Sequence, residues 1–168
     1  MGRVEVAIAL GSNLGDREAH LRFAHTRLAG ILSGFRLSAV HETVPLGVSE
    51  PQPNYLNQAA VGETFRTPRE LLALLLAIEG ERGRARPSAA AARTLDLDLI
   101  LAGDRVVSEP GLLVPHPRFR ERLFVLEPLA EIAPAMIDPI TGKTVRELLD
   151  LLTERLSAAG SALRRERP

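Results

Sequence analysis

Two aspartates stand two positions apart in the stretch Arg93-Thr94-Leu95-Asp96-Leu97-Asp98-Leu99-Ile100-Leu101. Leucine alternates with other residues there, and this period of two predicts a β-strand with two unlike faces. The leucines at 95, 97, 99 and 101 would face a core, and Asp96 and Asp98 would share the other face, roughly 6–7 Å apart. Two carboxylates that close repel each other unless a cation lies between them or one takes up a proton. Because Mg²⁺ binds one or two carboxylates together with water and phosphate oxygens, the pair predicts a magnesium site. The alternative is a half-exposed edge strand with solvated aspartates.

Arginines and one histidine gather in the sequence on both sides of this strand. They are Arg82, Arg84, Arg86 and Arg93 on one side, and His116, Arg118, Arg120 and Arg122 on the other. The donor fork of arginine matches phosphate oxygens, so a metal flanked by arginines would suit a polyphosphate. The alternative for each arginine is a solvated surface position, because Lys143 is the only lysine in an arginine-rich chain.

A second group of residues could bind a flat ring. Tyr55, the only tyrosine, and Asn57 follow the segment 43–53, which contains three prolines and is predicted to be a loop. An aromatic face stacks on a heterocycle and an amide forms paired hydrogen bonds with it, and Phe124 could cover the opposite side of the ring. The alternative is that both aromatic residues belong to the core, and that His116 only stabilises its own loop.

The composition limits the classes of function. A chain of 168 residues with 45% hydrophobic and 25% charged residues is typical of one globular domain. A net charge of zero does not favour broad binding to nucleic acid or to an anionic membrane. The absence of cysteine excludes disulfides, thiolate metal sites and cysteine nucleophiles. The first residues lack a signal-peptide pattern and the longest apolar run, 71–78, is too short to span a bilayer, so a cytoplasmic protein is expected.

The elements that must position these residues follow in a simple order. Strands are predicted over 4–10, 35–42, 55–64 and 93–101, and helices over 17–32, 67–80, 123–132 and from 144 onwards. Gly103-Asp104 predicts a hairpin turn into residues 105–107. Thr67 with Glu70, and Thr144 with Glu147, have the spacing of capping boxes. The order predicts an α+β fold, a ferredoxin-like βαββαβ sandwich with a mainly antiparallel sheet, an added hairpin and C-terminal helices. One domain is expected over residues 1–160, with a frayed tail over 161–168.

Several segments resemble, in order, those of a known family. They are Ala9–Gly15, Pro45–Gly47, Tyr55–Asn57, Arg93–Asp98, Val114–Arg118, Arg122–Leu126 and Pro128-Leu129. The family is 6-hydroxymethyl-7,8-dihydropterin pyrophosphokinase, of folate biosynthesis, and the resemblance spans about residues 4–152. It implies transfer of pyrophosphate from ATP to the hydroxymethyl group of the pterin, with release of AMP. We also expect a monomer that acts on small molecules and binds neither nucleic acid nor a membrane.

The resemblance also implies roles for individual residues. Catalytic positions are matched by Arg84, Arg93, Asp96 and Asp98, with two Mg²⁺ ions held by Asp96 and Asp98. ATP-binding positions are matched by Arg86, Leu99, His116 and Arg122. Pterin-binding positions are matched by Thr43, Val44, Pro45, Leu46, Tyr55, Asn57 and Phe124, with Tyr55 and Phe124 on the two sides of the ring.

One segment departs from the pattern of the family. The family commonly carries Arg-Trp and a proline shortly before its signature, whereas Ala89–Ala92 precede Arg93 here. The change would remove a cover over the pterin and one contact to ATP. Two other functions therefore stay open from the sequence. One is magnesium-dependent nucleotidyl transfer, which would release pyrophosphate, and the other is a non-catalytic or weakly active module that binds nucleotide or pterin.

Overall fold

The computed structural model describes residues 2–45, 50–83 and 94–165, with side chains up to residue 160. Of the predicted site residues, Leu46, Arg84, Arg86 and Arg93 lie outside the described residues. The elements are β1 (Val4–Ser12), α1 (Arg17–Ala29), β2 (Ser33–Leu37), β3 (His41–Thr43), β4 (Tyr55–Thr64), α2 (Pro68–Gly80), β5 (Asp96–Ala102), β6 (Val107–Glu109), β7 (Leu112–Val114), a 3₁₀ turn (Phe119–Glu121), α3 (Leu123–Ile132) and α4 (Val145–Arg165).

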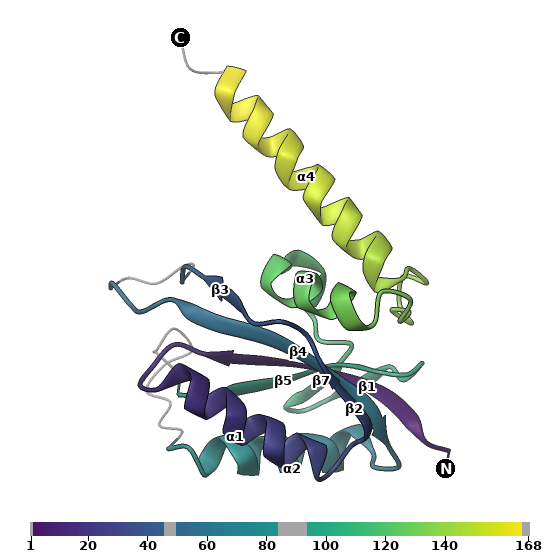
Figure 1. Ribbon diagram of the computed structural model, residues 1–168. Helices are drawn as coiled ribbons and strands as arrows, with labels where there is room; N and C mark the ends of the chain where they lie inside the picture. The colour runs from purple at the N-terminus through teal and green to yellow at the C-terminus, as the bar shows by residue number, and fades with distance from the viewer. Residues whose placement is uncertain (1, 46–49, 84–93, 166–168) are drawn as a thin grey trace.

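The main sheet has the strand order β2-β4-β1-β5, with β3 paired to β4, and neighbouring strands run antiparallel. Helices α1 and α2 cover one face, while α3 and the first turns of α4 lie over the other (Figure 1). This arrangement confirms the predicted α+β sandwich of the ferredoxin-like type.

A separate apolar core lies on each face of the sheet because the strands alternate. Ile8 and Leu10 of β1 point to the α1 and α2 side and join a buried cluster with Leu21 and Leu75. Ala7, which directly precedes Ile8, points to the other side and joins Phe119, Leu126 and Leu148. The central strand is therefore buried on both faces, which fixes its register against β4 and β5.

A bulge interrupts the alternation of β5. Ile8 pairs with Leu99 and Ala7 pairs with Leu101, so Ile100 is an extra residue without its own partner on β1. Leu95, Leu97 and Leu99 pack on the α1 and α2 side as predicted. The predicted orientation of Leu101 is wrong, because the extra residue moves it to the opposite core.

The predicted strand over 35–42 is two strands in the structure. Strand β2 ends at Leu37 and β3 begins at His41. Between them Ser38 holds β4 with its side chain, because its Oγ accepts a hydrogen bond from the Ala59 backbone N–H at 2.9 Å. This side-chain contact replaces one ladder bond and lets the chain change direction towards β3.

The predicted hairpin after β5 has a different partner. Gly103 makes a turn with a φ of +57°, but strand β6 then pairs with β7 and not with β5. The hairpin turn lies at Gly111, whose φ of +75° favours glycine. The β6–β7 hairpin borders one end of the site described below.

Helices α2 and α4 begin at the two capping boxes predicted from the sequence. Thr67 Oγ1 accepts from the Glu70 N–H while Glu70 Oε2 accepts from the Thr67 N–H at 2.7 Å, and Thr144 with Glu147 repeats this pattern. Both predicted capping boxes are confirmed.

Helix α4 extends to Arg165, away from the body of the sandwich (Figure 1). The frayed tail over 161–168 stays a prediction. Among the described helices, none combines the length and apolar character needed to cross a bilayer.

Candidate active site

Asp96 and Asp98 lie at the start of β5, which is an edge strand of the sheet. Asp96 pairs with Gly11 and Asp98 with Ala9, so both carboxylates project on the α3 side, opposite Leu97. Both side chains are partly exposed. The shared face predicted for the two aspartates is confirmed.

The donor set at this position fits magnesium. Two carboxylates on one face match the one or two that Mg²⁺ takes from protein. Within the described ranges no group of three or more acidic, histidine or cysteine side chains is placed to hold a metal ion. Magnesium at Asp96 and Asp98 would therefore complete its coordination with water and phosphate oxygens, as in other phosphate-transferring sites.

A buried glutamate that the sequence analysis missed supports this strand from its open edge. Glu79, at the end of α2, is 1% exposed, and its Oε1 accepts the Leu97 N–H at 2.7 Å. Leu97 stands between the two aspartates, so the contact fixes the backbone that carries both. The signal was present in the sequence, because Glu79 continues the buried stripe of Leu71, Leu75 and Ile78 along α2.

His116 lies beside the aspartates. Its Nε2 lies 4.0 Å from Asp98 Oδ2, and its Nδ1 accepts the Arg118 N–H at 3.2 Å. Burial, and next the charge of Arg122, lower the pKa of His116 to about 4, against the opposing effect of Asp96. The ring is therefore neutral at pH 7, with the proton on Nε2, where it can be donated into the cleft.

An open cavity of about 350 Å³ lies beside this end of β5. Its walls come from α2, from β5 and from the β6–β7 hairpin, and Leu72, Asp98, Leu99, Leu112 and His116 contribute to them. The structure thus brings together three residues predicted to serve ATP or its metal, namely Asp98, Leu99 and His116. Apolar walls with a few polar groups are typical of sites that bind small molecules.

Residues predicted to bind the pterin lie in register with the aspartates across the sheet. Asn57 pairs with Gly11, and Gly11 pairs with Asp96, so the three residues form one row on the same face. With strands about 4.8 Å apart, the Asn57 and Asp96 backbones are separated by about 10 Å. Thr43 pairs with Tyr55, and Asn57 Nδ2 donates to Thr43 Oγ1 at 2.6 Å.

Glycine leaves the middle of this row open. A Cβ at Gly11 would lie 3.6 Å from Asn57 Oδ1 and 3.7 Å from Tyr55 Cδ1. The space between the amide and the ring of Tyr55 is therefore bounded below by backbone alone, which a flat ligand can approach closely.

Phe124 and Arg122 stand at the start of α3, on the same side of the sheet. Phe124 is partly exposed and packs against the core beneath α3, and the Arg122 guanidinium lies 5.5 Å from the centre of its ring. One residue predicted for ATP thus contacts one predicted for the pterin. Of the remaining pterin candidates, Val44 is 69% exposed and Pro45 partly exposed, directly after Thr43.

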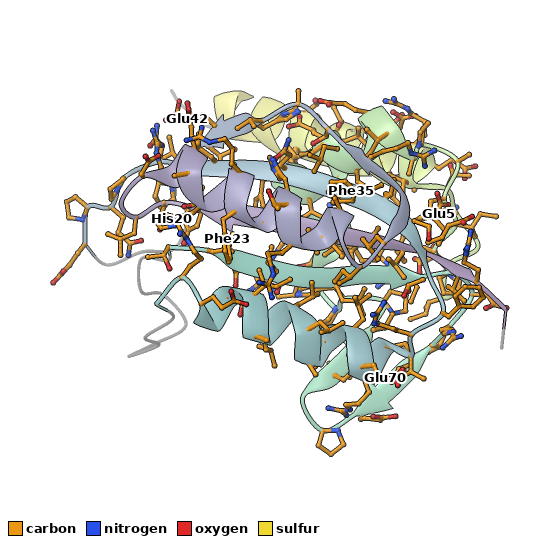
Figure 2. All side chains as sticks on the ribbon, turned by 60° about the horizontal axis from the view of Figure 1, so that its bottom comes forward. Glu5, His20, Phe23, Phe35, Glu42 and Glu70 are labelled. Atoms are coloured by element: carbon orange, nitrogen blue, oxygen red, sulfur yellow. The ribbon has the colours of Figure 1, made fainter. Side chains whose placement is uncertain are left out.

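Two arginines of the predicted phosphate cluster are engaged elsewhere. Arg82 Nε donates to His20 Nδ1 at 2.9 Å, and its guanidinium lies over the ring of Phe23. Because His20 and Phe23 belong to α1 (Figure 2), Arg82 is held against that helix. Arg120 forms a two-pronged ion pair with the fully buried Asp138, at 2.6 and 2.8 Å. Both arginines thus make structural contacts, and neither is the solvated surface residue of the alternative interpretation.

Replacing Arg120 with alanine is expected to destabilise the fold by about 3 kcal/mol, because the carboxylate of Asp138 would stay buried without its cation. Burial alone would raise the pKa of the Asp138 carboxyl, but hydrogen bonds from Arg120, Thr141 and the Ile140 N–H hold it below its usual range. The stability from this pair is therefore present at neutral pH and lost as the pH falls through that lowered pKa. Urea unfolding between pH 7 and pH 3 would check both effects. A similar acid dependence in Asp138→Asn would contradict the assignment.

Comparison with known families gives an independent result. Residues 7–134 match the family model described as 7,8-dihydro-6-hydroxymethylpterin-pyrophosphokinase. The chain is 42% identical over 146 residues to the 2-amino-4-hydroxy-6-hydroxymethyldihydropteridine pyrophosphokinase of Synechocystis sp., covering 85% of this chain and 73% of that protein. It is 46% identical over 129 residues to the Bacillus subtilis protein of the same name, covering 74% and 75%. The mitochondrial folate synthesis bifunctional protein of Arabidopsis thaliana is 40% identical over 135 residues, covering 80% of this chain and 24% of that protein.

Solved structures share the fold. A crystal structure of HPPK-DHPS in complex with substrates superposes with a TM-score of 0.71 at 13% identity, over 94% of this chain and 45% of that one. A Plasmodium falciparum HPPK-DHPS triple mutant with pteroate gives a TM-score of 0.75 at 13% identity, with the same coverage. The chain thus spans just under half the length of these solved chains.

Proposed function

The chain belongs to the 7,8-dihydro-6-hydroxymethylpterin-pyrophosphokinase family, and we propose that the sheet end bearing Asp96 and Asn57, with His116 beside it, is its active site. The enzyme transfers pyrophosphate from ATP to the hydroxymethyl group of 6-hydroxymethyl-7,8-dihydropterin and releases AMP. The observation that carries the site assignment is the row of Asn57, Gly11 and Asp96. It supports a ring-binding amide and a metal-binding carboxylate on one face, carried by backbones about 10 Å apart.

Asp96 and Asp98 would hold magnesium, and two ions are proposed because the family resemblance implies two. Magnesium held there would supply positive charge against the phosphate oxygens of ATP. The neutral His116 would donate Nε2–H to a phosphate oxygen, and Arg122 would supply positive charge at the same end of the cleft. Arg84, Arg86 and Arg93, outside the described residues, are proposed for the same phosphates, and Leu99 for the wall beside the nucleotide.

The pterin would lie over Gly11. Asn57 and Thr43 would hydrogen-bond its edge, Tyr55 and Phe124 would cover its faces, and Val44, Pro45 and Leu46 would complete the pocket. The reaction forms one bond, from the hydroxymethyl oxygen to the β-phosphorus of ATP, and breaks the bond from that phosphorus to the oxygen of AMP. As the new bond forms, the hydroxymethyl oxygen releases its proton to solvent, and AMP keeps the electron pair of the broken P–O bond. Transition states of such transfers are loose, so positioning and charge neutralisation supply most of the catalysis.

Incubation with ATP, Mg²⁺ and the pterin is expected to produce AMP and the pyrophosphorylated pterin in equal amounts. Omission of either Mg²⁺ or the pterin should stop AMP formation, and resolved nucleotides measure it directly. Release of pyrophosphate in place of AMP would identify nucleotidyl transfer. Binding of both substrates without AMP would identify a non-catalytic module, which the pyrophosphokinase relatives do not favour.

The remaining assignments are also proposals. We expect a single domain over residues 1–160 that acts as a cytoplasmic monomer on small molecules, without nucleic acid or membrane partners. Size-exclusion chromatography with light scattering tests the oligomeric state, and limited proteolysis tests the domain bounds.

A further inference from the structure

The chain segment between β3 and β4 is held at both described ends by one side chain. Arg17, the first residue of α1, donates from Nη1 to Glu42 Oε1 at 2.9 Å and to the backbone oxygen of Asn54 at 2.8 Å. Glu42 belongs to β3, and Asn54 directly precedes β4. A single guanidinium nitrogen therefore joins two positions that are twelve residues apart in the chain.

A second anchor from the same part of the chain strengthens this link. Asn13, fully buried after β1, donates from Nδ2 to Gln52 Oε1 at 3.1 Å and to the Pro53 backbone oxygen at 3.2 Å. The residues just before β4 are thus tied to the β1–α1 connection by side chains from two positions. Neither Arg17 nor Asn13 belongs to the proposed reaction or pterin contacts.

Each end held by Arg17 lies one residue from a proposed pterin contact. Glu42 precedes Thr43, and Asn54 precedes Tyr55. Thr43 and Tyr55 are paired across the β3–β4 ladder, and Thr43 also receives the hydrogen bond from Asn57. A displacement of β3 relative to β4 would therefore change the spacing among the hydroxyl, the ring and the amide that together form the pocket.

We infer that Arg17 is a positioning residue that sets the geometry of the pterin pocket through Glu42 and Asn54. The inference rests on the proposed function of that pocket. Arg17 and Glu42 are 30% and 53% exposed, so their ion pair adds little to global stability. Its effect should therefore be visible in pterin binding and not in the unfolding temperature, which separates positioning from general structural support.

A matched control pair, Arg36 and Glu5, lies at the end of the molecule opposite Glu42. Arg36 donates to Glu5 Oε1 at the same 2.9 Å, with exposures of 54% and 44%, and this pair joins β2 to β1. Glu5 and Glu42 lie at opposite ends of the molecule (Figure 2). Arg36→Ala therefore removes a similar surface ion pair far from the pocket.

Steady-state kinetics and titration of pterin fluorescence test the inference in the full chain. Arg17→Ala should raise the KM and Kd for the pterin about tenfold, the effect expected from losing charge-assisted hydrogen bonds, with kcat and the KM for ATP within about twofold. Arg17→Lys, which keeps a donor charge, should recover most of the affinity, and Arg36→Ala should behave as wild type. Glu42→Gln should give a smaller rise, and it probes the same link should Arg17→Ala fail to fold.

An unchanged pterin affinity in Arg17→Ala, or an equal loss in Arg36→Ala, would overturn the inference. A lower kcat and higher KM values for both substrates, together with a lower unfolding temperature, would also overturn the inference. Absence of AMP formation by the wild-type chain would overturn the proposed function, and with it this role. Normal wild-type turnover with an unaffected Arg17→Ala variant would overturn this inference alone.

Discussion

Asp98→Asn is expected to lower kcat/KM by about 10³-fold, which corresponds to about 4 kcal/mol of transition-state stabilisation. Asparagine keeps the shape of the side chain but offers magnesium a neutral amide oxygen in place of a carboxylate. Because Asp98 Oδ2 also lies 4.0 Å from His116 Nε2, the variant removes a negative charge next to the histidine as well. Asp96→Asn should behave in the same way, with a higher Mg²⁺ requirement in each case.

The measurement is AMP formation over a range of Mg²⁺ concentrations, together with the unfolding temperature. Both aspartates are partly exposed, so the fold should tolerate the neutral side chain. Asp104→Asn, an exposed position in the turn after β5, supplies the control and should be fully active. Activity within tenfold of wild type, with an unchanged Mg²⁺ dependence, would show that Asp98 holds no metal.

Phe124→Leu is expected to weaken pterin binding by about 10- to 100-fold, since stacking of one ring on an aromatic side chain contributes about 1–3 kcal/mol. Leucine retains the apolar packing beneath α3 but presents no flat face to the pterin. The affinity for ATP should change less, because Phe124 is proposed to contact the pterin, and its described contact with an ATP candidate is the one with the guanidinium of Arg122. Fluorescence titration of each substrate separates the two effects.

Phe65→Leu is the matched control for this change. Phe65 is 62% exposed, and the Arg3 guanidinium lies 5.0 Å from its ring, in an arrangement like that of Arg122 and Phe124. The variant therefore removes a similar aromatic–arginine contact that the proposed site does not contain. Equal losses of pterin affinity in both variants would contradict a stacking role for Phe124.

The parts of the fold that the sequence predicts are those set by local chemistry. Thr67 and Thr144 each begin a helix because their hydroxyls and the glutamates three residues later satisfy neighbouring N–H groups. Asp96 and Asp98 share a face because a strand alternates. These features need only a few consecutive residues, so they can be read before any tertiary contact is known.

The features that escaped prediction depend on distant partners. Ser38 ends β2 because its hydroxyl meets Ala59 on another strand, and Leu101 changes sides because β1 offers Ile100 no partner. Arg82 and Arg120 have the same side chain as the proposed phosphate ligands, and only His20 and Asp138 reveal their structural use. Residue type and spacing do not specify which neighbour a long side chain reaches.

The position of Gly11 on β1, between Asn57 and Asp96, has a consequence for substrate selectivity. Since Gly11 contributes only main chain there, two hydrogen-bonded strand spacings set the separation of the Asn57 and Asp96 backbones, and only two short side chains add to it. Side-chain motion does not change this backbone separation. It would favour alcohols whose carbon arm places the oxygen at that fixed reach and disfavour longer or shorter homologues of the same ring.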